Sequence, residues 1–129
     1  GAFRSDRNGD EAGESYVIFG REEGFSASLS LDSLNGYNGF RLEGIATGDR
    51  SGVSVSKAGD FNGDGIDDLV IGASGADLDQ DGLTGHGQVY VFFGRETGFQ
   101  ASFDLGDLDG SNGFRLDGID RRDATGGSV

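Results

Sequence analysis

Four residue types are missing from this 129-residue chain, which has no cysteine, proline, methionine or tryptophan. Without cysteine it can form neither a disulfide framework nor a thiolate metal site, so any cross-link within it must come from other chemistry. No apolar run approaches the roughly 20 residues that a membrane-spanning helix needs. The sequence therefore excludes a disulfide-stapled domain and predicts no membrane span.

Positive charge is also scarce. The 10 Lys and Arg residues stand against 23 Asp and Glu residues, and the formal net charge is -13. Such a chain repels a phosphate backbone or an anionic membrane surface, which argues against nucleic acid as a partner. Because a bound cation partly neutralises an excess of carboxylates, the composition favours a cation as a ligand.

What the chain has in excess is glycine, with 26 residues, and an internal repeat. The segment Tyr-Val-Ile-Phe-Gly-Arg-Glu-Glu-Gly-Phe at 16–25 recurs 74 residues later at 90–99, and the match continues without a gap through the Asn-Gly-Phe-Arg-Leu stretches at 38–42 and 112–116. A fixed period of this size indicates units that bury their apolar faces against neighbouring units. The chain holds about 1.7 such units, fewer than the roughly three that repeat arrays usually need.

Hydrophobic patterning within one unit predicts strands and almost no helix. The expected strands of the complete unit are residues 53–56, 68–73, 88–93 and 113–116, the last preceded by an Asn-Gly turn dipeptide. Short turns of helix are expected only at 31–34 and 105–108. The continuous apolar run at 69–71 is of the kind that is buried on both faces of a sheet. Four antiparallel strands per unit, apolar on both faces, predict an all-β fold of β-propeller blades.

The repeat also predicts how the chain is divided. Residues 1–50 are expected to form the later half of one blade, with its third and outer strands. Residues 51–124 are expected to form one complete blade, and residues 125–129 the start of the first strand of the next. Neighbouring blades or identical chains would complete such an array, as a closed ring or as a polymer.

The most informative stretch lies between the first two strands of the complete blade. In Asp-Phe-Asn-Gly-Asp-Gly-Ile-Asp-Asp at 60–68, oxygen-bearing side chains recur at alternate positions. Calcium takes about six to eight oxygen ligands, usually including carboxylates, and Gly63 and Gly65 allow the backbone to fold around a small ion. The pattern predicts a calcium site with ligands from Asp60, Asn62, Asp64, Ile66 (through its main-chain carbonyl) and Asp68.

The same loop has two other interpretations. An EF-hand needs flanking helices and a glutamate at the twelfth loop position, where this chain has Ile71 between strands. An acidic turn that closes the hairpin without metal remains the alternative to the calcium site.

The loop and its flanking strands resemble a known repeat. Residues 59–73, Gly-Asp-Phe-Asn-Gly-Asp-Gly-Ile-Asp-Asp-Leu-Val-Ile-Gly-Ala, followed by Gly-Gln-Val-Tyr-Val-Phe at 87–92, are similar to the FG-GAP repeat of integrin α-subunit β-propellers and of bacterial repeat proteins. The resemblance implies a seven-bladed propeller with calcium in the hairpin between the first two strands of a blade. It also implies an extracellular or cell-surface location and a role in adhesion or ligand binding. The two motifs that name the repeat are degraded here, to Ser51-Gly52 and to Gly-Ala-Ser at 72–74.

Two further features are weaker candidates for chemistry. A second acidic stretch with Asp77, Asp79 and Asp81 could hold another cation, but its ninth position is Gly85, which supplies no carboxylate, and a solvated acidic loop is the alternative. The single histidine, His86, lies between two glycines with no evident nucleophile partner, which indicates a loop residue rather than a catalytic base.

These features predict a non-catalytic, calcium-binding β-propeller segment of an extracellular adhesion or protein-interaction protein. Its ligand, protein or glycan, is left open by the sequence. One alternative is a structural subunit of an extracellular filament, sheath or surface layer, in which strands of one chain complete a blade of the next. Another is a non-catalytic piece of a larger secreted enzyme.

Overall fold

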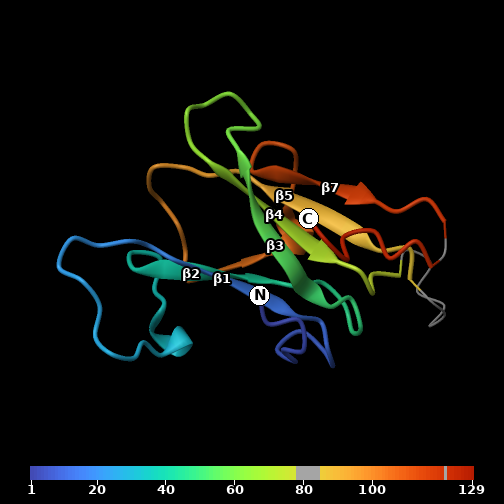
Figure 1. The fold of residues 1–129 in the computed structure, drawn as a ribbon, viewed down its shortest axis with the longest axis horizontal. Helices are drawn as coiled ribbons and strands as arrows, with labels where there is room; N and C mark the ends of the chain where they lie inside the picture. The colour runs from blue at the N-terminus through green and yellow to red at the C-terminus, as the bar shows by residue number, and fades with distance from the viewer. Residues whose placement is uncertain (78–84, 121) are drawn as a thin grey trace.

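Two β-sheets dominate the computed structural model, which describes residues 1–77, 85–120 and 122–129 (Figure 1). The first sheet has the order β1-β2-β6 and the second has the order β3-β4-β5-β7. The strands are β1 (Glu14–Ile18), β2 (Gly39–Glu43), β3 (Ser51–Gly59), β4 (Asp68–Ala73), β5 (Gln88–Phe92), β6 (Ser102–Asp104) and β7 (Gly113–Asp117). Two single-turn 3-10 helices, η1 (Leu31–Ser33) and η2 (Leu105–Asp107), are the only helices in the described part of the chain.

The second sheet is the four-stranded antiparallel blade that the sequence predicts. The boundaries of three strands differ from the expected ones: β3 extends beyond 53–56 at both ends, β5 ends at Phe92 rather than at Phe93, and β7 continues to Asp117 rather than ending at Leu116. Side-chain alternation fades towards the ends of β3, where the pairing with β4 is irregular, so the pattern alone underestimates its length. The two 3-10 turns form where short turns of helix are expected.

The first sheet is not purely antiparallel, which the sequence did not predict. Strands β1 and β2 are antiparallel, but β6 lies parallel to β2 with Leu42 opposite Phe103. In the 74-residue repeat β1 corresponds to β5 and β2 to β7, whereas β6 belongs to the second unit. The parallel pair therefore joins one unit to the other.

The hydrophobic core lies between the two sheets and draws on both units. Its buried members are Phe40, Leu42, Ile71, Ala73, Ala76, Tyr90, Phe92 and Leu105. The rings of Phe40 and Phe99 stack with centroids 4.5 Å apart, and Phe92 lies 5.6 Å from Phe40. Aromatic pairs in these arrangements add about 0.5–1.5 kcal/mol each beyond the area that they bury. Contacts between the units therefore contribute to the stability of this chain.

A tyrosine occurs at the same repeat position in both units, fully buried at Tyr90 and partly buried at Tyr16. The Tyr90 hydroxyl donates a hydrogen bond of 2.5 Å to Oε1 of Gln88, and the Tyr16 hydroxyl donates to Oε2 of Glu14. Burial is the main cause that raises the pKa of both phenols above the usual range. Because Glu14 carries a charge where the second unit has Gln88, it needs the neighbouring Arg7 guanidinium, whose Nε lies 3.3 Å from its Oε1.

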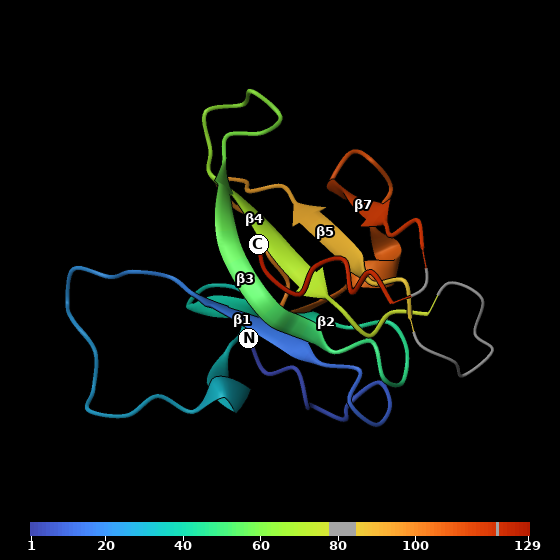
Figure 2. The same ribbon diagram turned by 45° about the vertical axis from the view of Figure 1, so that its right-hand side comes forward.

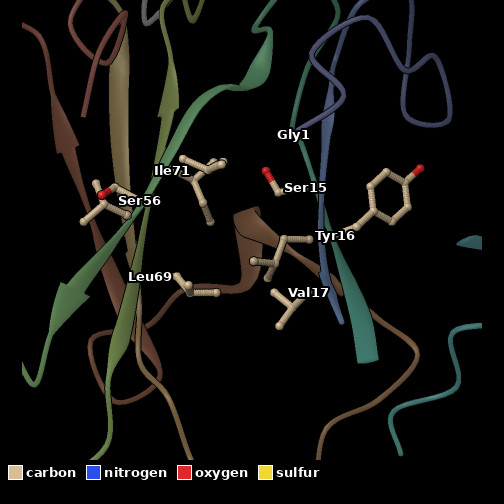
Figure 3. Close-up of a pocket in the computed structure, with 10 residues that line it drawn as sticks. Gly1, Ser15, Tyr16, Val17, Ser56, Leu69 and Ile71 are labelled. Atoms are coloured by element: carbon tan, nitrogen blue, oxygen red, sulfur yellow. The ribbon is translucent and has the colours of Figure 1, made fainter. Parts of the chain in front are cut away.

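A mainly apolar cavity of about 140 Å³ separates β1 from the β3–β4 pair. Figure 3 shows Ser15 and Val17 on one side of it and Leu69 and Ile71 on the other. No strand in the described part of the chain pairs with the edge of β1 that faces away from β2. None of the described helices is long and apolar enough to cross a membrane.

Candidate metal centre

The loop predicted to bind calcium connects β3 to β4 and projects beyond the end of the sheet (Figure 2). The last residue pair of the two strands, Gly59 opposite Asp68, closes the loop at its base. Gly59, Gly63 and Gly65 have φ angles of 68°, 80° and 89°, a region that side-chain-bearing residues rarely adopt. Glycine at these positions lets the chain reverse within a few residues.

Three of the predicted ligand side chains turn back onto the loop's own backbone. Asp60 accepts hydrogen bonds from the N–H groups of Asp64 (2.8 Å) and Gly65 (2.9 Å). Asn62 Oδ1 accepts from the Asp64 N–H at 3.0 Å, and its amide nitrogen donates to Asp64 Oδ2 at 2.9 Å. Asp64 Oδ1 accepts from the N–H of Ile66 at 2.8 Å. The structure therefore brings the oxygens of Asp60, Asn62 and Asp64 together on the inner side of the loop.

The fourth predicted ligand side chain, Asp68, is fully buried at the base of the loop. Its Oδ2 accepts from the N–H of Phe61 and its Oδ1 from the N–H of Gly94, each at 2.8 Å. No cationic side chain in the described part of the chain pairs with it. Burial of a carboxylate is unfavourable unless hydrogen bonds and a positive charge compensate for the lost hydration.

Gly94 is a residue of the site that the sequence pattern did not single out. Besides donating its N–H to Asp68, it packs so closely on the loop that a Cβ atom would lie 2.4 Å from the main-chain oxygen of Asp67. Its repeat counterpart, Gly20, has open space around it in the described structure. The recurrence of Phe-Gly at 19–20 and 93–94 was the signal that could have identified it.

The donor chemistry of the loop fits a hard divalent cation. The side-chain atoms that would bind the ion are all oxygens. Each carboxylate also retains lone pairs beyond those that accept hydrogen bonds from the N–H groups. The four side chains are not arranged around one centre, however, because Asp68 faces the amides at the loop base. No cluster of three Asp, Glu or His side chains suited to a metal occurs within the described ranges. Ion binding would therefore have to bring Asp68 and the three inner side chains to one centre.

The second acidic stretch falls largely outside the described residues, which include neither Asp79 nor Asp81. Asp77 is half-buried, and its charge adds to the effect of burial in raising the pKa of the buried Asp49 carboxyl. His86 lies outside the named strands, as expected of a loop residue.

An all-β chain with one complete four-stranded antiparallel blade and a partial sheet against it is a segment of a β-propeller. Residues 51–92, which contain the loop and strands β3 to β5, match the model of the FG-GAP repeat. They are an integrin-like FG-GAP repeat, which confirms the resemblance drawn from the sequence.

Curated relatives match the chain over more than this repeat. Phosphatidylinositol-glycan-specific phospholipase D of Homo sapiens is 37% identical over 92 residues, which is 70% of this chain and 10% of the relative. The protein of the same name from Rattus norvegicus is 35% identical over 88 residues, 68% of this chain and 10% of its own length. Integrin alpha-PS5 of Drosophila melanogaster is 41% identical over 56 residues, 43% of this chain and 5% of the relative. The chain thus spans a tenth or less of the length of these relatives.

Proposed function

We propose that this chain is a calcium-stabilised, non-catalytic part of a β-propeller in an extracellular or cell-surface protein that binds other proteins or glycans. The observation that carries the calcium assignment is the loop at 60–68. Asp60, Asn62 and Asp64 accept hydrogen bonds from the backbone of the loop, and the described residues provide no cation for the fully buried Asp68 carboxylate at its base. Similarity to integrin alpha-PS5 supports the location and the binding role.

A calcium ion in this loop would act as a structural cross-link. When bound, it supplies the positive charge that compensates for the burial of Asp68. Asp68 is hydrogen-bonded to Gly94, just after the end of β5, while Asp60 directly follows β3. The loop residues thereby connect the ends of β3, β4 and β5, and an ion held among them would fix the blade at that end.

The phospholipase relatives favour a second candidate for the intact protein. They carry the name of an enzyme, and this chain matches only about a tenth of their length. We therefore propose that, if the intact protein is an enzyme, its catalytic residues lie outside this segment. The proposed role of the segment itself is that of a non-catalytic propeller scaffold, whether the intact protein is a binding protein or an enzyme.

Calcium is expected to raise the thermal unfolding midpoint of the chain. At a calcium concentration a hundredfold above the dissociation constant, binding to the folded state adds about 2.7 kcal/mol, which corresponds to a rise of about 10 °C for a chain of this size. The measurement is thermal unfolding followed by circular dichroism, in calcium and in a chelator.

Two double variants extend this measurement, one that removes proposed ligands and one that serves as its control. Asp60→Asn with Asp64→Asn removes two proposed ligand charges and should abolish the rise. Glu22→Gln with Glu96→Gln changes the net charge equally at two exposed repeat counterparts and should leave the rise intact. An unfolding midpoint that is the same in calcium and in chelator would refute the calcium part of the proposal.

A further inference from the structure

Every asparagine of this chain is followed by glycine. The five Asn-Gly pairs lie at 8–9, 35–36, 38–39, 62–63 and 112–113. Asparagine is a thermolabile residue, and it loses its side-chain amide most readily before glycine, because glycine has no Cβ atom to keep its backbone nitrogen away from the asparagine Cγ. Since the following residue is the same in all five pairs, any difference between them must come from the fold.

The reaction consumes water and releases ammonia. The glycine N–H loses its proton to a base in the solvent, and the nitrogen then forms a bond to Cγ of the asparagine. The side-chain nitrogen leaves as ammonia with a proton taken from water. Water opens the resulting cyclic imide at one of its two carbonyls, which gives aspartate or isoaspartate. The glycine N–H must therefore be available, and the backbone beside it must be able to turn.

In four of the pairs the glycine is packed against other parts of the chain. A Cβ atom at Gly9 would lie 2.3 Å from the hydroxyl oxygen of Thr47. At Gly36, Gly39 and Gly113 it would lie 2.2 Å from a main-chain oxygen of another segment. These contacts leave the backbone no room for the rotation that brings the nitrogen to Cγ.

Hydrogen bonds hold the same four pairs. The N–H of Gly9 donates to the carbonyl of Asp6 at 3.3 Å, and the N–H of Gly36 donates to the carbonyl of Gly39 at 2.8 Å. Gly39 and Gly113 are the first residues of β2 and β7. The side-chain amide of the asparagine before each of them donates to a main-chain carbonyl, at 2.9 and 3.1 Å. Reaction at any of these pairs requires local unfolding first.

The pair Asn62–Gly63 has neither restraint. Beyond its neighbours in the chain, no heavy atom lies within 4 Å of the place where a Cβ of Gly63 would be. The N–H of Gly63 donates no hydrogen bond in the part of the chain that the structure describes. Both residues are exposed, in the loop that projects beyond the sheet (Figure 2).

The loop also stabilises the charge that the reaction creates. The N–H of Asp64 donates to Oδ1 of Asn62 at 3.0 Å. When the Gly63 nitrogen attacks Cγ, negative charge develops on this oxygen, and a hydrogen-bond donor already in place stabilises it.

We infer that Asn62–Gly63 is the site at which the folded chain deamidates. Either product places a carboxylate where Nδ2 of Asn62 donates to Oδ2 of Asp64 at 2.9 Å, so a hydrogen bond is replaced by repulsion between like charges. Isoaspartate also adds a carbon atom to the backbone of the loop. A bound calcium ion slows the reaction by holding Oδ1 of Asn62, and this last statement alone rests on the proposed function.

Peptide mapping of the full chain tests the inference. The chain is incubated in a chelator at mildly alkaline pH, digested with trypsin and analysed by mass spectrometry against a sample taken at time zero. Cleavage at Lys and Arg gives the peptide 58–95, whose single asparagine is Asn62, while Asn8 and Asn112 fall in 8–21 and 96–115. Deamidation raises the mass of a peptide by about 1 Da. Peptide 58–95 should gain it at least about tenfold faster than the other two.

Two controls separate the fold from the sequence. In urea all five pairs are unfolded, so the rates of the three peptides should agree within about threefold. Deamidation adds one negative charge to the formal -13 of the chain, so anion exchange separates the product. Asn62→Gln, at an exposed residue, should abolish the early product, and Asn8→Gln, also at an exposed residue, should leave it unchanged.

Two outcomes would overturn the assignment of the site. One is a rate for 58–95 in the folded chain no faster than that of 8–21 or 96–115. The other is the same preference for 58–95 in urea, which would mean that the fold does not cause it. Saturating calcium should slow deamidation of Asn62 and leave that of Asn8 unchanged. Equal rates for Asn62 in calcium and in chelator would overturn the protection by calcium and refute Asn62 as a ligand, while the site itself would stand.

Discussion

Replacement of Phe92 by alanine is expected to lower the free energy of unfolding by about 3–5 kcal/mol, the range for large-to-small changes at buried aromatic residues. Phe92 is 2% exposed, and its ring centroid lies 5.1 Å from that of Phe103 and 5.6 Å from that of Phe40. Truncation leaves a cavity at the point where both sheets and both units meet. Because whole domains are stable by only about 5–15 kcal/mol, this one change should remove a large share of the total.

The internal repeat supplies a matched control for that measurement. Ile18 occupies the same repeat position as Phe92 but is 45% exposed, and it lies on β1, whose outer edge has no partner strand in the described structure. Ile18→Ala is expected to change the free energy of unfolding by less than about 1 kcal/mol. Urea unfolding of both variants measures the difference. Equal losses of unfolding free energy in the two variants would mean that Ile18 and Phe92 are buried to the same extent, contrary to the structure.

Replacement of Asp68 by alanine is expected to lower the free energy of unfolding in calcium by about 2–5 kcal/mol. The change removes the acceptor for two backbone N–H groups, those of Phe61 and Gly94, and an unsatisfied buried donor costs about 1–3 kcal/mol. It also removes the proposed ligand that ties the loop to the end of β5. Part of the loss should therefore disappear in a chelator, where no ion binds in either protein.

The neighbouring Asp67 is the control for this second prediction. Its side chain is exposed, and its only ion pair in the described structure is with Lys57 at 3.9 Å. Exposed pairs of this kind contribute up to about 1 kcal/mol, so Asp67→Ala should have little effect. Chemical unfolding of the two variants with and without calcium checks both statements. A loss for Asp67→Ala as large as that for Asp68→Ala would show that Asp68 does not anchor the loop.

The complete blade could be predicted because its signals are local. Side-chain alternation, the apolar run at 69–71 and the Asn-Gly dipeptide before β7 all fall within a few residues of the structure that they specify. The repeat then placed β1 and β2 by analogy with β5 and β7. The same local signals located the loop at 60–68 between β3 and β4, whereas calcium binding by Asp60, Asn62 and Asp64 stays a prediction.

The β2–β6 pair could not be predicted, because it depends on a contact between distant segments. Residues 28–30 and 102–104 occupy the same repeat position, yet only the second segment is a strand, since only it lies beside β2 and pairs with it. A local pattern cannot distinguish the two. The same limit applies to Asp68, whose hydrogen-bond donor, the N–H of Gly94, is 26 residues away in the chain.

The measurement that most directly tests the central claim is a calorimetric titration of the chain with calcium. A site at 60–68 predicts binding of about one ion per chain, with a dissociation constant no weaker than the millimolar range of extracellular calcium modules. It predicts loss of that binding in the Asp60→Asn, Asp64→Asn variant and its retention in the Glu22→Gln, Glu96→Gln variant. If the unmodified chain binds no calcium, or if the Asp60→Asn, Asp64→Asn variant binds it equally well, the loop is an acidic turn and not a calcium site.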